Sequence, residues 1–99
     1  MRVRLLASAR DDLAGGRAFY EMQGRGLGDY FLDSLFADID SLALYGGIHA
    51  KVFGYHRLLP HRFPYAVYYK VDAEGYVVVY RVLDCRQNPE KTRRALKAG

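Results

Sequence analysis

The chain has 99 residues, 51% of them hydrophobic, and a formal net charge of +4 from 15 basic and 11 acidic residues. This length predicts one domain over residues 1–99, and the positive charge favours an anionic partner such as a nucleic acid or an acidic peptide. A lone cysteine, Cys85, excludes an internal disulfide and a cysteine-cluster metal site, and no apolar run reaches the roughly 18 residues of a membrane span, so we expect a cytoplasmic protein.

The N-terminal part predicts a strand followed by a helix. Residues 2–7 read as a short strand, and Ser8 with Asp11 resembles a capping box that opens a helix over about 9–22. Two adjacent glycines inside this helix each cost roughly 1 kcal/mol relative to alanine. We therefore expect tertiary packing, rather than intrinsic propensity, to hold the first helix.

The second predicted helix has the clearest pattern in the chain. A glycine-rich loop over 23–28 precedes it, and Gly46 and Gly47 should end it. Two helices joined by such a short loop should pack as an antiparallel hairpin. Apolar residues form the buried stripe at spacings of four, four, four and three: Leu27, Phe31, Leu35, Ile39 and Leu42.

The remaining sequence is rich in strand-forming residues. Residues 51–61 and 63–71 read as two strands, the second with a proline at its entrance, and a turn over 72–75 follows. The apolar run over 76–84 indicates a central strand buried on both faces. A short final helix with Pro89 in its first position closes the order β-α-α-β-β-β-α.

Aromatic residues are abundant, with nine tyrosines and five phenylalanines. Base stacking on such rings is worth roughly 1–3 kcal/mol per base. However, strand alternation separates Tyr65, Val67 and Tyr69 from Tyr68, and one of these faces must cover the helices. We therefore expect Tyr65 in the core and Tyr68 as the better candidate for an exposed contact.

Five motifs in chain order carry a resemblance to a known family. They are Asp12-Leu13 with Phe19-Tyr20-Glu21, Gly26-Leu27-Gly28 before the apolar stripe, His56-Arg57-Leu58-Leu59, Phe63-Pro64-Tyr65 with Tyr68-Tyr69, and the ending Val82-Leu83-Asp84-Cys85-Arg86-Gln87-Asn88-Pro89. Together they resemble the RelE/ParE toxin superfamily of type II toxin–antitoxin systems, which includes ParE-like plasmid stabilisation proteins.

The resemblance implies an α+β fold in which an N-terminal strand and a helical hairpin pack on a small, mainly antiparallel sheet. It also implies a growth-arresting toxin neutralised by a cognate antitoxin, whose acidic C-terminal segment folds on binding. The groove beside the hairpin and the exposed sheet edge are the natural receiving surfaces. Operator DNA would be contacted only through the antitoxin, and no membrane or cofactor is implied.

Three functions stay open for such a protein. ParE-like members inhibit DNA gyrase, RelE-like members cleave mRNA on the translating ribosome, and a third possibility is an inactive member that only binds its antitoxin. The ending departs from the family pattern, because Asp84 stands at the usual histidine position and Gln87 replaces the second arginine. These departures weaken the expectation of nuclease activity, and fold alone does not choose the target.

The candidate residues for chemistry and binding follow from charge and position. Metal-independent RNA cleavage needs a base, an acid and stabilisation of the phosphorane charge, for which arginine is suited. The catalytic candidates are Arg57, Arg81 and Arg86, which we expect on one concave face, and Asp84, which acts either as a base or as a structural partner of an arginine or helix end. The candidates for nucleic-acid or target binding are Lys51, His56, His61, Arg62, Arg93 and Arg94.

Two further residues are predicted to have no functional role. His49 lies in a loop with no visible partner, and Cys85 reads as a passive small residue. His56 and His61 could each act as an acid or base, although exposed strand histidines are more often inert. We predict no metal site, because the acidic residues lack ligand spacing.

Overall fold

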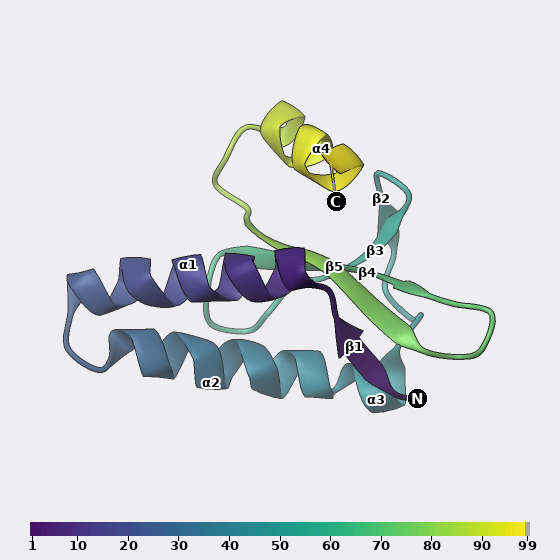
Figure 1. Ribbon diagram of the computed structural model, residues 1–99, viewed down its shortest axis with the longest axis horizontal. Coiled ribbons are helices and arrows are strands. Elements are labelled where there is room, and N and C mark those ends of the chain that lie inside the picture. The colour runs from purple at the N-terminus through teal and green to yellow at the C-terminus, as the bar shows by residue number, and fades with distance from the viewer. Residues whose placement is uncertain (99) are drawn as a thin grey trace.

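The computed structural model describes residues 1–98 and contains a five-stranded sheet with helices on both faces (Figure 1). The sheet order is β1-β5-β4-β3-β2, with β1 parallel to β5 and all other pairs antiparallel. The strands are β1 (Val3–Leu5), β2 (Lys51–Val52), β3 (Tyr55–Leu58), β4 (Tyr65–Val71) and β5 (Val77–Asp84). The helices are α1 (Ala7–Gln23), α2 (Leu27–Asp40), α3 (Leu42–Tyr45) and α4 (Pro89–Ala98).

The α+β fold and the mainly antiparallel sheet confirm the prediction, with one strand added. Residues 51–58 form a tight hairpin, β2 and β3, rather than the single strand predicted over 51–61, because Phe53 and Gly54 both adopt positive φ and reverse the chain. The second helix also differs from its predicted course. It ends at Asp40, Ser41 breaks it, and the short α3 continues to Gly46.

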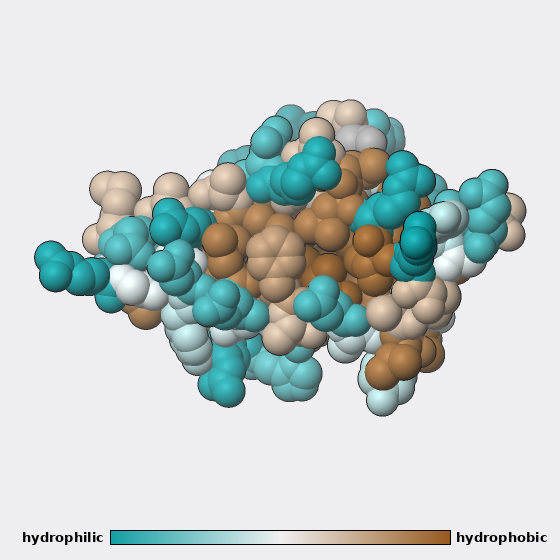
Figure 2. Space-filling view, turned by 60° about the horizontal axis from the view of Figure 1, so that its bottom comes forward, coloured by the Kyte–Doolittle hydropathy of each residue, from teal (hydrophilic) through white to brown (hydrophobic). Residues whose placement is uncertain are grey.

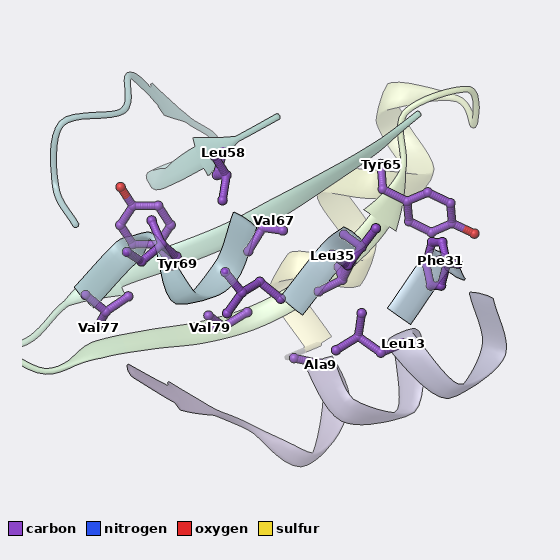
Figure 3. Close-up of a cluster of buried hydrophobic side chains, with 13 residues drawn as sticks. Ala9, Leu13, Phe31, Leu35, Leu58, Tyr65, Val67, Tyr69, Val77 and Val79 are labelled. Carbon is purple, nitrogen blue, oxygen red and sulfur yellow. The ribbon is translucent and has the colours of Figure 1, made fainter. Parts of the chain in front are cut away.

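The helical hairpin covers one face of the sheet and forms the larger core (Figure 3). The stripe predicted for α2 is confirmed at its inner positions, whereas Leu27 is 37% exposed because it lies at the first turn near the hairpin tip. Tyr65, Val67 and Tyr69 meet this stripe from β4, as alternation predicted. The largest fully buried side chains of the hairpin core come from α2, α3 and the sheet: Phe31, Leu35, Ile39, Leu42, Val67, Tyr69, Val77, Val79 and Val82.

A β-bulge explains how β5 supplies this core. Tyr68 pairs with Arg81 and Tyr69 pairs with Val79, so Tyr80 is an extra residue on β5. Strict alternation would put Val79 and Val82 on opposite faces. The extra residue restores both valines to the hairpin side, where each is almost fully buried.

The helix α4 covers the opposite face of the sheet and closes a smaller core. In Figure 1 it lies across the sheet from the α1–α2 hairpin. This core consists of Ala66, Tyr68, Leu83 and Leu96. The predicted exposure of Tyr68 is therefore wrong, because α4 packs over its ring and leaves it 4% exposed.

The first turns of α1 lie along the edge of β5 beyond the point where β1 ends, and they bond to the backbone of β5 there. Ser8 does not cap the helix as predicted; its hydroxyl donates to the carbonyl of Tyr80 at 2.7 Å. One turn later, the Asp12 carboxylate accepts the backbone N–H of Val82 at 2.9 Å. These two bonds satisfy strand groups that would otherwise lack partners.

No helix within residues 1–98 has the length and apolarity needed to cross a membrane.

Candidate functional site

Two of the three candidate arginines, Arg57 and Arg81, lie on the α4 side of the sheet, because the strand register places both beside Tyr68. Arg81 is bound there to α1 and α4, and Arg57 lines a cavity beside α4, whereas Arg86 lies near Tyr65 of the hairpin core. The expectation that all three arginines share one face is therefore wrong for Arg86, whereas Arg57 and Arg81 do lie on the same side of the sheet. The reason is strand alternation, since Arg81 pairs with Tyr68 of the α4 side, whereas Asp84, the partner of Arg86, pairs with Tyr65 of the hairpin side.

Arg81 is tied into a network that joins three elements. Its Nε and Nη2 donate to the two carboxylate oxygens of Asp12 at 2.7 and 2.8 Å, and its Nη1 donates to the carbonyl of Ala95 in α4 at 3.1 Å. The hydrogen bond with Asp12 raises the pKa of Arg81. With its side chain only 20% exposed, Arg81 holds β5, α1 and α4 together. This geometry favours a structural role.

Arg86 and Asp84 form a close pair at the end of β5. Asp84 accepts from the Nε and Nη2 of Arg86 at 3.0 and 2.7 Å, and from its backbone N–H at 2.8 Å. These hydrogen bonds lower the pKa of the Asp84 carboxyl, which makes it a poorer base. Burial, with help from Asp84, raises the pKa of neighbouring Tyr65 to about 12. Of the two readings for Asp84, the arginine partner is the one that the geometry shows, while Asn88 caps α4.

Arg57 lines a cavity of about 200 Å³ between the β2–β3 hairpin and α4. Tyr68 and Cys85 share this cavity, and burial raises the pKa of both groups while the charge of Arg57 opposes that shift. The raised pKa disfavours the reactive thiolate form of Cys85, which fits the prediction of a passive residue.

The histidine predicted to have no partner, His49, belongs to a cluster that sequence reasoning missed. Its Nδ1 lies 2.5 Å from the hydroxyl of Tyr69, which also accepts the backbone N–H of Gly47 at 2.9 Å. His56 stacks on the ring of Tyr69 and bonds through Nδ1 to the carbonyl of His49 at 2.6 Å. The one available signal was Tyr69 itself, because a buried tyrosine hydroxyl needs a partner. Which residue supplies that partner depends on the conformation of the loop that carries His49.

This cluster predicts a pH-dependent stability. Burial, and then the charge of His56, lower the pKa of His49 from 6.5. The unfolded chain therefore takes up a proton near 6.5 that the folded chain resists, so stability is highest above this pH and falls as the pH drops through it. Urea unfolding about one unit above and one unit below 6.5 should show a larger loss for the wild type than for His49→Gln. Equal losses would exclude His49 as the cause.

The six binding candidates lie in three separate places. His61 and Arg62 flank α2, where His61 bonds to Asp38 at 2.7 Å and Arg62 lies 5.9 Å above the Tyr30 ring. Lys51 and His56 face each other across β2 and β3. On α4, Arg93 pairs with Glu90 at 2.6 Å and Arg94 is exposed. No single patch unites them.

Residues 1–98 show no hydrogen bond or ion pair between a histidine and Arg57, Arg81 or Arg86. Acid–base chemistry at a phosphate would need such neighbours within hydrogen-bond reach. In the same range, no three histidine, cysteine or acidic side chains gather closely enough to hold a metal ion. The arginines thus offer charge for binding, and the histidine cluster around Tyr69 forms no hydrogen bond with them within residues 1–98.

An apolar area occupies the middle of the molecular face that carries α2 and α3, and hydrophilic side chains surround it (Figure 2). Large apolar side chains on these elements are unusually open, with Phe36 40% and Leu44 79% exposed. Exposed apolar patches of this kind mark interaction surfaces. The exposed apolar or aromatic side chains of α2 and α3 are Leu27, Tyr30, Phe36, Leu44 and Tyr45.

Comparison with known proteins gives a match at the level of structure. The sequence matches no protein-family model and no curated protein. A chain of a solved structure, the chromosomal ParDE TA (toxin–antitoxin) system from P. aeruginosa, aligns with a TM-score of 0.67 over 85% of this chain and 95% of its own length. The chain has a ParE-like fold. Because the two sequences are only 18% identical, the ParE-like fold is what this likeness establishes.

Proposed function

We propose that this protein is the toxin of a type II toxin–antitoxin pair and that it acts as a ParE-like inhibitor of DNA gyrase. The observation that carries this proposal is the ParE-like fold, which matches a chain from a toxin–antitoxin structure over most of its length. The motifs of the sequence point the same way, above all Phe63-Pro64-Tyr65 at the entrance of β4. Such a protein would act in the cytoplasm.

The site geometry favours a binding inhibitor over a nuclease. Arg81 is occupied by Asp12, Asp84 is paired with Arg86, and the histidines lie elsewhere. The second candidate, a ribosome-dependent mRNA endonuclease, is supported by Arg57 and the basic residues of α4 on one side of the sheet. An inactive member that binds only its antitoxin is the third.

The antitoxin is expected to use the apolar face in Figure 2 and a free strand edge. An amphipathic helix would bury its apolar side against Phe36 and Leu44, and an extended segment would pair with β1 or β2 at the ends of the sheet. The positive charge of the chain suits the acidic C-terminal segment of such a partner.

Expression in a bacterial host tests the proposal. The protein produced alone should arrest growth, and co-expression with the neighbouring reading frame should restore it, because binding covers the toxin's surfaces. Growth is followed after induction, with the empty vector as control. Normal growth together with a monodisperse soluble monomer in the absence of any partner would refute the toxin assignment.

The target is separated by two readouts in the arrested cells. Induction of the SOS response is expected if gyrase is poisoned, because stalled gyrase leaves DNA damage. Cleavage of translated mRNA at codon ends without an SOS response would instead support the endonuclease. Tight antitoxin binding by a protein that does not arrest growth would identify an inactive member.

A further inference from the structure

A groove between the β2–β3 hairpin and α4 has no place in the function proposed so far. It consists of two cavities, of about 380 and 200 Å³, which share Phe53 as a lining residue. We call it the α4 groove. Its lining combines aromatic, apolar and basic side chains: Phe53, Tyr55, Tyr68, Leu96, Arg57, Lys70, Arg93 and Lys97.

The α4 groove carries an excess of positive charge from three elements. Arg57 comes from β3, Lys70 from β4, and Arg93 and Lys97 from α4. Within residues 1–98, only Arg93 of these four forms an ion pair, with Glu90. The ammonium of Lys70 lies instead 4.6 Å from the ring centre of Tyr55. Basic side chains that converge on a concave surface raise the local concentration of anionic ligands.

Phe53 is an unusual residue at the mouth of the α4 groove. It occupies the first central position of the β2–β3 turn with φ +56°, followed by Gly54 at +84°. Turns with two positive φ values prefer Asn-Gly, and a bulky side chain is rare there. The Phe53 ring is nevertheless 44% exposed and contributes to both cavities. The turn itself does not require an aromatic residue at this position, and the exposed ring is open to contact with a ligand.

We propose that the α4 groove binds an acidic peptide segment that inserts an apolar side chain beside Phe53 and Leu96. Carboxylates of the segment would contact Arg57, Lys70 and Lys97. The inference rests on the proposed function for one point only, which is that the acidic segment is the tail of the antitoxin. This docking surface lies across the sheet from the apolar face of α2 and α3, so one tail would reach both sides of the toxin.

The observations favour a peptide over single-stranded RNA. Stacking of bases needs open aromatic faces. In the α4 groove, Lys70 lies over the rings of both Tyr55 and Tyr80, at 4.6 and 5.6 Å from their centres. Tyr68 is buried, which leaves Phe53 as the one widely exposed aromatic ring among those that line the groove within residues 1–98.

The lone cysteine provides the test, because Cys85 is exposed and lines the same groove. Alkylation of Cys85 by iodoacetamide is followed by mass spectrometry in the presence of three probes. The probes are a synthetic peptide of alternating acidic and leucine or phenylalanine residues, its lysine-for-acid counterpart, and oligouridylate RNA. The acidic peptide should slow alkylation, whereas the other two should not. Equal protection by RNA, or no protection by the acidic peptide, would overturn the proposal.

Matched variants locate the binding. Phe53→Asn should keep the turn, since an Asn-Gly pair suits it. It should nevertheless lower the affinity for the acidic peptide by roughly tenfold, as expected for loss of an aromatic anchor. Lys97→Gln should lower the affinity for this peptide more than Arg25→Gln does, although Arg25→Gln removes the same charge from the tip of the α1–α2 hairpin. Unchanged affinity in both groove variants would contradict the proposal.

The same experiment keeps the two proposals apart. Protection of Cys85 in a protein that does not arrest growth would leave the α4 groove standing and remove the toxin assignment. Growth arrest rescued by an antitoxin whose affinity is unaffected by Phe53→Asn and Lys97→Gln would support the toxin assignment and overturn the groove.

Discussion

Replacing Asp12 by alanine is expected to lower the free energy of unfolding by about 3 kcal/mol, because it removes one partner of a largely buried ion pair and leaves the other charge unpaired. Asp12 accepts two hydrogen bonds from Arg81 and one from the backbone of Val82, and its side chain is 14% exposed. The variant would leave the Arg81 guanidinium uncompensated and the Val82 N–H without its partner. Urea unfolding followed by circular dichroism measures the loss.

The neighbouring residue supplies the control. Asp11 has the same side chain on the same helix but is exposed and forms no ion pair within residues 1–98. Asp11→Ala should therefore change stability by no more than about 0.5 kcal/mol. If the two variants unfolded at the same urea concentration, the network of Arg81 would not be what joins α1, β5 and α4.

The Asp12–Arg81 pair also shows where sequence reasoning reaches its limit. The helical stripe through Phe31, Leu35 and Ile39 was predictable, because a spacing of three and four is a local property of a helix. The partner of Arg81 is 69 residues away along the chain and is fixed only when α1 lies against the edge of β5. In the sequence, the guanidinium of Arg81 is a candidate for binding phosphate, whereas in the fold it is already bound to Asp12.

The sheet gives a second example, again in terms of particular residues. Alternation correctly separated Tyr65, Val67 and Tyr69 from Tyr68, because each side chain of a strand points opposite to the last. It did not predict that α4 covers the second face and buries Tyr68, since amphipathic strands do not say what lies above them. Nor did it predict the extra residue Tyr80, on which the position of Arg81 depends.

The candidate site was the part least accessible from sequence. The types of residue were identified, with arginines and histidines in the sheet region, but their grouping was not. The loop over 46–50 brings His49 onto the hydroxyl of Tyr69, and the Phe53–Gly54 turn creates the α4 groove. Both features depend on loop conformation, for which this sequence contains no periodic signal.

Gly16→Ala is expected to destabilise the protein by about 2 kcal/mol, because α1 and α2 meet there too closely for a side chain. A Cβ atom at this position would lie 2.5 Å from the ring of Phe31. That ring is fully buried and packed against Tyr20, Phe63 and Tyr65, so it has little room to move. Overpacking of up to about 3 kcal/mol therefore exceeds the gain of about 1 kcal/mol that alanine brings to a helix.

The adjacent glycine should respond in the opposite sense. A Cβ atom at Gly15 would meet nothing within 4 Å, so Gly15→Ala keeps only the helical gain and should stabilise the protein by up to about 1 kcal/mol. Chemical denaturation of the two variants then gives changes of opposite sign from the same substitution one residue apart. If both variants were stabilised, the close packing of α1 on Phe31 would be refuted, and the glycine pair would be a weakness of the helix rather than the contact that sets the distance between α1 and α2.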